Sequence, residues 1–393
     1  MNNSQSSSTR NDSRLYSTQN QPSISDFDKS CKQTISNHEY PLATVIEKNI
    51  PVYDLAAVSS TNQNEVSALQ DEWYQALSDG PGVFVVKNFF QEATVLQTAN
   101  CAFQAIIARE RSQVKGDHFA AGGKNDRIWN SSSKHCLQDP VSFVNYYSNP
   151  WLAQISEAWL GPQYRITAQV NIVKPGGAPQ ISHRDYHLGF QTADGCARFP
   201  KGIQYASQFL TLQGAVAQTD MSLESGPTRF LPFSQKLGEG SLACRTSDFD
   251  NYFSKNWVSL PLKQGDGVFF NPALHHAAGR NDSNVDRSAN LLQISSAFGK
   301  PMESIDAVQL LGKCWDLIKT KYQETGYSAG IGALISAVGE GYPFPTNLDR
   351  RPPASNGMAP SSEQDVIKEA LLQDLSTGEV VNALQQMRAD ATA

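Results

Sequence analysis

Residues 164–190 have the sequence YRITAQVNIVKPGGAPQISHRDYHLGF, and the rest of the chain is organised around this stretch. Its first part places apolar residues at every second position from Ile166 to Ile172, which predicts a β-strand with one face against a core. A Pro-Gly-Gly turn follows. Residues 181–190 then bring together two histidines, a carboxylate, a guanidinium and a phenol, a density of reactive groups that points to a functional site.

His183 and Asp185 are two residues apart, so on an extended backbone their side chains project from the same face. One imidazole and one carboxylate at this spacing can reach a common metal ion. His187 shares that face if the segment stays extended, and it is then an alternative ligand to His183. Two ligands are too few for a metal site, and a His-x-Asp pair is short enough to arise by chance. The metal hypothesis therefore requires a further ligand elsewhere in the chain.

The sequence Gly267–Gly279 contains the pair His275-His276, which can supply that ligand from another strand. Adjacent strand residues face opposite sides, so only one of the two can point inward, and the alternation alone does not say which. Arg287 follows eleven residues after His276 and opens an apolar strand. A charge inside a β core is costly unless it is paired. A dicarboxylate co-substrate would pair with it, because guanidinium binds carboxylate bidentately.

Many short strands separated by glycine and proline predict a jelly roll or sandwich. The fold class that we predict is mainly β with flanking helices, with a double-stranded β-helix (jelly-roll, cupin-like) core near 164–298. Beyond the strand at 164–173, the expected strands are 207–216, 228–231, 257–262, 267–270 and 288–297. The expected helices are 64–77, 91–111, 150–160, 305–322 and 363–387, with a strand at 83–86 and a long loop at 118–135.

Three segments are expected along the 393 residues. Residues 1–45 are polar and rich in Ser, Asn and Gln, which predicts a disordered arm. Residues 46–345 form a single domain around the β core. Residues 346–393 add a C-terminal loop and helix.

Composition narrows the classes of partner. A formal charge of −6 without a basic run argues against nucleic acid, and no apolar run is long enough to cross a bilayer. The polar N-terminal stretch lacks the apolar segment of a signal peptide, and the six cysteines show no Cys-x-x-Cys spacing. These features predict a cytoplasmic protein with reduced thiols that acts on a small molecule. A homodimer is left open.

The string His276-x-x-Gly279-x-Asn281-x-Ser283-x-x-x-Arg287, with His183-x-Asp185 upstream, resembles the phytanoyl-CoA dioxygenase family. This family belongs to the iron(II)- and 2-oxoglutarate-dependent oxygenases. The resemblance covers about residues 80–300 and includes Asp220, the turn 224–228 and the motif 232–235. In that last motif the family has Pro-Gly-Ser-His, whereas this chain has Phe233 and Gln235 in place of the glycine and histidine. The role of that histidine therefore cannot be transferred.

The resemblance implies a ligand set and a co-substrate anchor. His183, Asp185 and His276 would be the facial triad that holds Fe(II), and Arg287 would hold the far carboxylate of 2-oxoglutarate, with O2 as the third reactant. His275 would then be a neighbour of the site or a surface residue. An aspartate at position 185 argues against the halogenase branch, in which a small residue makes room for halide.

Further residues are expected around the pocket. Gln169 and Asn171 share one face of the 164–173 strand, and we expect both to point inward, with Gln169 contacting the co-substrate. The candidates for contact with the substrate are Asn171, Arg127 in a glycine-flanked loop, His187, and the aromatic pair Tyr342 and Phe344 of an aromatic-proline segment.

The predicted function is oxidation of an unactivated C–H bond of a small metabolite by hydroxylation, desaturation or oxidative cyclisation. The polar termini and the His-Arg-Asp-Tyr-His-Leu-Gly-Phe form are similar to fungal biosynthetic members of the family. Some of these act on free amino acids, including aziridine formation from valine, and Arg127 would then bind the substrate carboxylate. The alternatives are an acyl-CoA or terpenoid hydroxylase of the same family, a non-catalytic jelly-roll binding protein, and a cupin-type metal isomerase or hydrolase.

Overall fold

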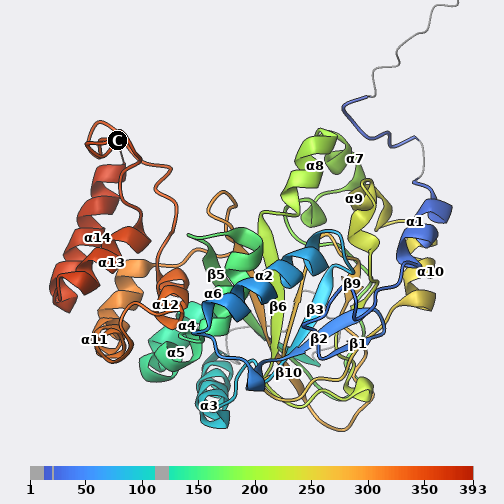
Figure 1. The fold of residues 1–393 in the computed structure, drawn as a ribbon, viewed down its shortest axis with the longest axis horizontal. Coiled ribbons are helices and arrows are strands. Elements are labelled where there is room, and N and C mark those ends of the chain that lie inside the picture. The colour runs from blue at the N-terminus through green and yellow to red at the C-terminus, as the bar shows by residue number, and fades with distance from the viewer. Residues whose placement is uncertain (1–12, 20–21, 111–123, 393) are drawn as a thin grey trace, which may run out of the picture.

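The computed structural model of the protein describes residues 13–19, 22–110 and 124–392, and its centre is an eight-stranded sheet (Figure 1). Each pair of neighbouring strands is antiparallel except β2 and β3, which run parallel. In spatial order the strands are β1 (Val45–Glu47), β2 (Ile50–Asp54), β3 (Val83–Lys87), β8 (Gly267–Phe270), β6 (Thr211–Ala217), β10 (Arg287–Ser295), β5 (Arg165–Val173) and β4 (Asn125–Ile128).

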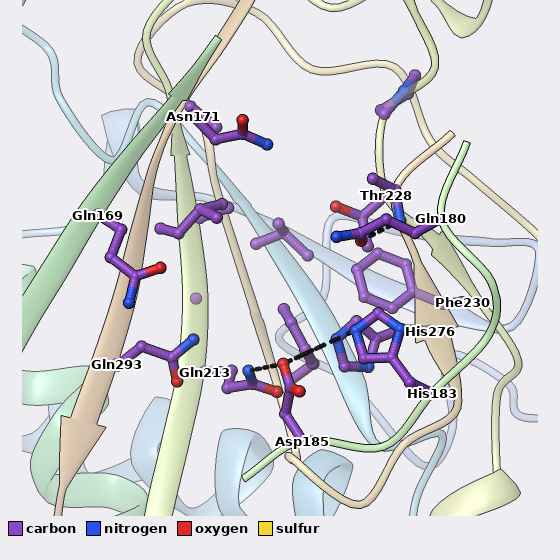
Figure 2. A pocket seen from close by; sticks show the side chains of 18 of the residues that line it. Gln169, Asn171, Gln180, His183, Asp185, Gln213, Thr228, Phe230, His276 and Gln293 are labelled. Atoms are coloured by element: carbon purple, nitrogen blue, oxygen red, sulfur yellow. Dashed lines mark hydrogen bonds and ion pairs between the residues drawn. The ribbon is translucent and has the colours of Figure 1, made fainter. Parts of the chain in front are cut away.

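A smaller β layer faces the middle of this sheet. It contains the antiparallel pair β7 (Arg229–Phe230) and β9 (His276–Ala277). Isolated bridges from His183 to His276 and from Phe230 to Val258 extend the layer on both sides. Residues of both layers line one cavity (Figure 2). The two layers therefore provide opposite walls for whatever binds between them.

The period-two pattern of β5 explains how the sheet is used. Ile166, Ala168 and Val170 belong to the main hydrophobic core, which the helices complete on the outer face of the sheet. Gln169 and Asn171 alternate with them and line the cavity on the inner face. This placement confirms that both amides point inward, because successive strand residues face opposite sides.

Helices cover the sheet. In the described chain more residues lie in helices than in strands, so the prediction of a mainly β protein is wrong, whereas the predicted flanking helices are present. The strands are short, and the molecule gains much of its buried area from helices outside the sheet. The helices are α1 (Ile24–Cys31), α2 (Gln63–Ser78), α3 (Ala93–Glu110), α4 (Ser131–Gln138), α5 (Pro140–Tyr147), α6 (Pro150–Leu160), α7 (Ala193–Ala197), α8 (Lys201–Ser207), α9 (Gly240–Ala243), α10 (Ser247–Asn256), α11 (Ala307–Thr325), α12 (Ala329–Val338), α13 (Glu363–Leu372) and α14 (Thr377–Ala391).

The predicted N-terminal arm differs from the structure between residues 22 and 45. Helix α1 forms there, with Ser23 accepting a hydrogen bond from the N–H of Asp26 as its N-cap. Phe27 of α1 is completely buried and packs against the rings of Phe249 and Tyr252. One buried aromatic side chain therefore attaches a polar stretch to the domain. Residues 1–12, 20 and 21 of the predicted arm lie outside the described residues.

Three other expectations differ from the structure. Part of the predicted loop 118–135 forms β4 and the start of α4, whereas residues 118–123 lie outside the described residues. Residues 257–262 make only single bridges rather than a strand. The expected helix 363–387 is two helices, α13 and α14, because Ser376 caps a new helix with Glu379 in a capping box.

The C-terminal helices belong to the main core. Ile367 and Leu371 of α13 and Val380 and Leu384 of α14 are buried in the same hydrophobic cluster as α11 and α12. The indole N–H of Trp315 donates to the backbone oxygen of Leu375 at 2.8 Å. No helix in the described ranges is both long enough and apolar enough to span a bilayer.

Candidate metal centre and active-site pocket

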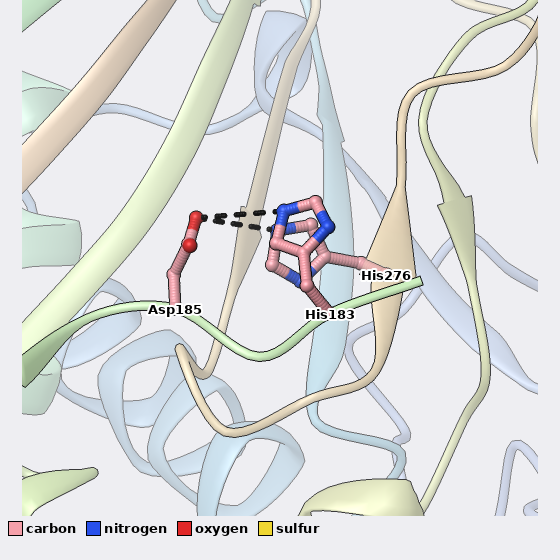
Figure 3. Close-up of side chains that lie close together, drawn as sticks. All are labelled: His183, Asp185 and His276. Atoms are coloured by element: carbon pink, nitrogen blue, oxygen red, sulfur yellow. Dashed lines mark ion pairs between the residues drawn. The ribbon is translucent and has the colours of Figure 1, made fainter. Parts of the chain in front are cut away.

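Three side chains of the smaller β layer and its adjoining segment, His183, Asp185 and His276, lie close together (Figure 3). His183 and His276 exchange two backbone hydrogen bonds of 3.0 Å, so the two residues lie side by side although 93 positions separate them. The N–H of Asp185 donates to the backbone oxygen of Pro272 at 3.0 Å. The extended backbone from His183 to Asp185 is thus held against the segment that carries His276.

The three side chains converge on one point. Oδ2 of Asp185 lies 3.8 Å from Nε2 of His183 and 3.6 Å from Nε2 of His276. One potential ligand atom from each of the three residues lies within 4.8 Å of the other two. His276 is buried, whereas His183 and Asp185 are partly exposed to the cavity. This spacing allows all three residues to bind a single ion.

The second nitrogen of each imidazole has a partner that fixes the tautomer. Nδ1 of His183 lies 2.8 Å from the backbone oxygen of Ile181, and Nδ1 of His276 lies 2.9 Å from that of Leu274. A carbonyl oxygen only accepts, so Nδ1 carries the hydrogen in both rings. In each neutral ring Nε2 then carries the free lone pair, and both Nε2 atoms face Asp185.

The charge of the site also suits a divalent metal. Burial raises the pKa of Asp185, but the positive charge of the His183 and His276 imidazoles when they are protonated, together with a hydrogen bond from Gln213, outweighs it and holds the pKa below its ordinary range. Burial lowers the pKa of His183, which favours the neutral ring that binds metal. Two imidazole nitrogens and one ionised carboxylate are the donor set that non-haem iron(II) takes in oxygenases, so the residues fit that metal.

Arg287 begins β10 and lies in the same cavity, almost completely buried. Its Nη1 donates to the backbone oxygens of Ser225 and Gly279 at 3.0 and 3.2 Å. Burial lowers its pKa to about 10, so the guanidinium stays charged at neutral pH. No carboxylate in the described part of the chain forms an ion pair with Arg287. A buried cation of this kind fits an anionic ligand brought in from solution.

The cavity around these groups has a volume of about 830 Å³ (Figure 2). Four carboxamides line it on neighbouring strands: Gln169 and Asn171 of β5, Gln213 of β6 and Gln293 of β10. Apolar side chains from the sheet, such as Val268 and Phe270 of β8, line it as well. A ligand in this space therefore meets both amide groups and apolar surface.

The structure brings several predicted pocket residues together. Arg127 of β4 lines the cavity, and its Nη1 donates to Oε1 of Gln169 at 2.9 Å. Its guanidinium lies 5.0 Å from the ring centre of Trp129, which also lines the cavity. Asn171 is the cross-strand neighbour of Arg127 and shares this wall. Arg127, Gln169 and Asn171 are therefore placed where a bound molecule would contact them.

Three predicted substrate contacts are not among the described residues that line the cavity. His187 has a φ of 45°, which ends the extended segment and starts a short 3₁₀ helix, and its ring lies 3.4 Å from Oγ1 of Thr211. It therefore does not share the face of His183. Tyr342 and Phe344 are half-exposed and pack edge-on against each other, and Tyr342 also packs against Phe298. Their rings complete an external aromatic cluster rather than the cavity wall.

His275 directly precedes β9, and its side chain points away from that of His276, towards Phe27 of α1. Its ring is fully buried 5.2 Å from that of Phe27 on α1, so it is an internal rather than a surface residue. Burial and the nearby Arg184 lower its pKa, so the ring is neutral. The choice of His276 over His275 depends on which side of this strand faces the cavity.

Sequence reasoning missed Gln213, Gln293, Trp129 and Met302 of the cavity wall. Two of these residues could have been identified from the sequence. Gln213 and Gln293 are amides inside otherwise apolar strands, and such a position needs a partner. The contribution of Met302 follows only from the path of the loop after β10.

Residues 61–289 match the family model of phytanoyl-CoA dioxygenase (PhyH). Among curated proteins, the chain is similar to the uncharacterized protein YJR154W of Saccharomyces cerevisiae, with 29% identity over 48% of this chain and 53% of the yeast protein. The match thus spans about half the length of that relative. The chain is also 28% identical to the dioxygenase cdmA of Talaromyces verruculosus, over 57% of this chain and 72% of that protein.

Among solved structures, the chain is similar to the non-heme alpha ketoglutarate dependent epimerase SnoN from nogalamycin biosynthesis. The TM-score is 0.41 and the sequence identity is 18%, over 59% of this chain and 84% of that one.

Proposed function

The chain belongs to the phytanoyl-CoA dioxygenase family, whose members use iron(II), 2-oxoglutarate and O2, and we propose that it oxidises an unactivated C–H bond of a small metabolite. The observation that carries this proposal is the shared cavity of the His183, Asp185 and His276 group and the buried cation Arg287. A metal site alone would fit many reactions. The adjacent cation supplies the second requirement of the reaction, an anchor for a dicarboxylate.

Each group has a separate task in this proposal. His183 and His276 present their Nε2 lone pairs, and Asp185 adds a negative charge, so together they would hold the metal on one side of the cavity. Arg287, which is almost completely buried, would bind the far carboxylate of 2-oxoglutarate. When bound, iron(II) supplies oxygen activation coupled to decarboxylation of 2-oxoglutarate. The amides of β5 and the apolar walls would orient the substrate.

We further propose that the central strands and the smaller layer are the predicted double-stranded β-helix. Strands β5, β10, β6 and β8 would be one sheet of this core. The segments at residues 183, 276–277, 229–230 and 258 would be the other. The bridge between His183 and His276 supports the assignment, because it joins two metal ligands within one layer.

The size of the cavity favours a substrate larger than valine. Ligand pockets commonly measure roughly 300 to 1,000 Å³ and enclose molecules of drug size. Valine and 2-oxoglutarate are both small, so together they would leave much of the 830 Å³ unfilled. We therefore place a terpenoid or another large metabolite ahead of a free amino acid. Aziridine formation from valine stays a prediction, with Arg127 as its carboxylate contact.

A turnover assay tests the proposal. Purified protein with iron(II), ascorbate and 2-oxoglutarate should form succinate, and a pool of terpenoids should accelerate this more than pools of amino acids or acyl-CoAs. Asp185→Ala should abolish the activity. Arg287→Ala should raise the 2-oxoglutarate concentration for half-maximal rate by roughly 10- to 100-fold, the usual value of a charged hydrogen bond.

Arg280→Ala is the matched control, because Arg280 is exposed and pairs with Asp282 outside the cavity. It should leave the requirement for 2-oxoglutarate unchanged. Turnover that needs no 2-oxoglutarate and survives Arg287→Ala would instead support a cupin-type isomerase or hydrolase. A protein that binds metabolites but forms no succinate would support the non-catalytic binding protein.

A further inference from the structure

Gln213 is the one described residue outside the metal-binding group that contacts the Asp185 carboxylate through a side-chain hydrogen bond. Its Nε2 donates to Oδ2 of Asp185 at 2.8 Å (Figure 2). That oxygen is also the one that lies 3.6 and 3.8 Å from the two imidazole Nε2 atoms. The amide therefore contacts the side of the carboxylate that faces the metal position.

The backbone of Gln213 is firmly held. Strand β6 lies between β10 and β8, where Gln213 pairs with Gln293 on one side and with Phe270 on the other. Its side chain is buried, so few rotamers remain open to it. Asp185, in contrast, lies in a non-helical segment after a single bridge. The firmly held strand β6 thus orients Asp185, which lies on a segment with less regular structure.

Structural stability does not explain an amide at this place. Oε1 of Gln213 is buried and has no hydrogen-bond partner, and a half-satisfied buried amide is less favourable than an apolar side chain of the same shape. The half that is satisfied is the half that reaches Asp185.

On the basis of the proposed function, we propose that Gln213 is a positioning residue for the metal. It fixes the rotation of the Asp185 carboxylate so that Oδ2 stays aimed at the point where the two imidazoles converge. A neutral amide does this without adding charge. Partners of this type that orient metal ligands commonly contribute 10- to 100-fold in metal affinity or activity.

Gln293 provides a matched control. It lies directly opposite Gln213 on the neighbouring strand, is buried, lines the same cavity and also has a buried Oε1 without a partner. It makes no hydrogen bond to His183, Asp185 or His276 in the described structure. Methionine approximates the length and volume of glutamine without its donor. Gln213→Met and Gln293→Met therefore differ mainly in contact with the metal group.

The test is anaerobic titration of the metal-free proteins with Fe(II) in the presence of 2-oxoglutarate, followed by the charge-transfer absorption of the complex. Gln213→Met should weaken Fe(II) binding by about 10- to 100-fold. Gln293→Met should bind Fe(II) as the wild type does. Gln213→Met also removes the donor that stabilises the buried Asp185 carboxylate, so the melting temperature of the metal-free variant is measured alongside and Fe(II) affinities are compared only below it. If this variant does not fold, Gln213→Asn, which is too short to reach Asp185, replaces it.

Two results would overturn the inference. One is Fe(II) affinity of Gln213→Met within about threefold of the wild type, and the other is equal weakening by Gln293→Met. Neither affects the proposed function if the wild type binds Fe(II) and forms succinate. A wild type that binds no Fe(II) would overturn both.

Discussion

At the residue scale, single hydrogen bonds decide which chemistry each group can perform. Two backbone oxygens hold the protons of His183 and His276 on Nδ1 and leave Nε2 for a metal. Two further backbone oxygens hold Arg287 without neutralising it. Burial rather than a hydrogen-bond partner sets the protonation of Glu303, a carboxyl group next to Met302 of the cavity wall.

Glu303 accepts the N–H of Asn130 at 2.7 Å, and burial raises its pKa from the ordinary 4.5 to about 7. The folded state therefore holds this proton more tightly than the unfolded state, so stability falls as pH rises from about 4.5 to 7. Glu303→Gln lacks this loss. Relative to the wild type, its free energy of unfolding in urea should rise between pH 5 and pH 8, by up to about 3 kcal/mol. Equal differences at both pH values would contradict this, and Glu65→Gln on the exposed face of α2 is the control.

At the element scale, short segments with little regular structure are attached by a few buried side chains. Helix α1 is the clearest case, since it is mostly exposed and Phe27 is its one buried residue. The ring contacts of Phe27 reach α10 and His275, which directly precedes the proposed ligand His276. Through the contact between Phe27 and His275, α1 packs against the side of the segment that faces away from the metal centre.

Phe27→Ala should lower the free energy of unfolding by about 3 to 5 kcal/mol, the usual range for truncating a buried phenylalanine. Ile24→Ala on the same helix should change it by less than about 0.5 kcal/mol, because Ile24 is exposed. Urea unfolding monitored by fluorescence measures both. Equal effects of the two substitutions would show that α1 is not held by Phe27.

At the scale of the whole molecule, the cavity lies on one face of the sheet and the helical core on the other. Helices α13 and α14, which lie in the predicted C-terminal segment 346–393, contribute buried residues to the same core as α11 and α12. The ion pairs of Arg388 with Asp306 and Glu363 join α14 to the start of α11 and to α13. The support of the sheet therefore extends to the last described helix.

A chain that ends at residue 345 should lose cooperative unfolding or melt far below the full chain. It would lack α13 and α14 and expose the apolar face of α11 and α12 that they cover. Thermal unfolding measured by circular dichroism tests this. Deleting only residues 389–393 is the control and should have little effect, since none of residues 389–392 is buried. An unchanged melting temperature for the shorter chain would show that the C-terminal helices are dispensable.

The sequence by itself was sufficient for local features that depend on neighbours in the chain. The alternation from Ile166 to Ile172 predicted β5 and the inward direction of Gln169 and Asn171, and the motif singled out the three side chains, His183, Asp185 and His276, that the structure brings together. Only the tertiary structure decided that His276 rather than His275 faces Asp185, that His187 turns away, and that Gln213 reaches the carboxylate. Those outcomes depend on the register between strands that are distant in sequence, and no local pattern of residues specifies that register.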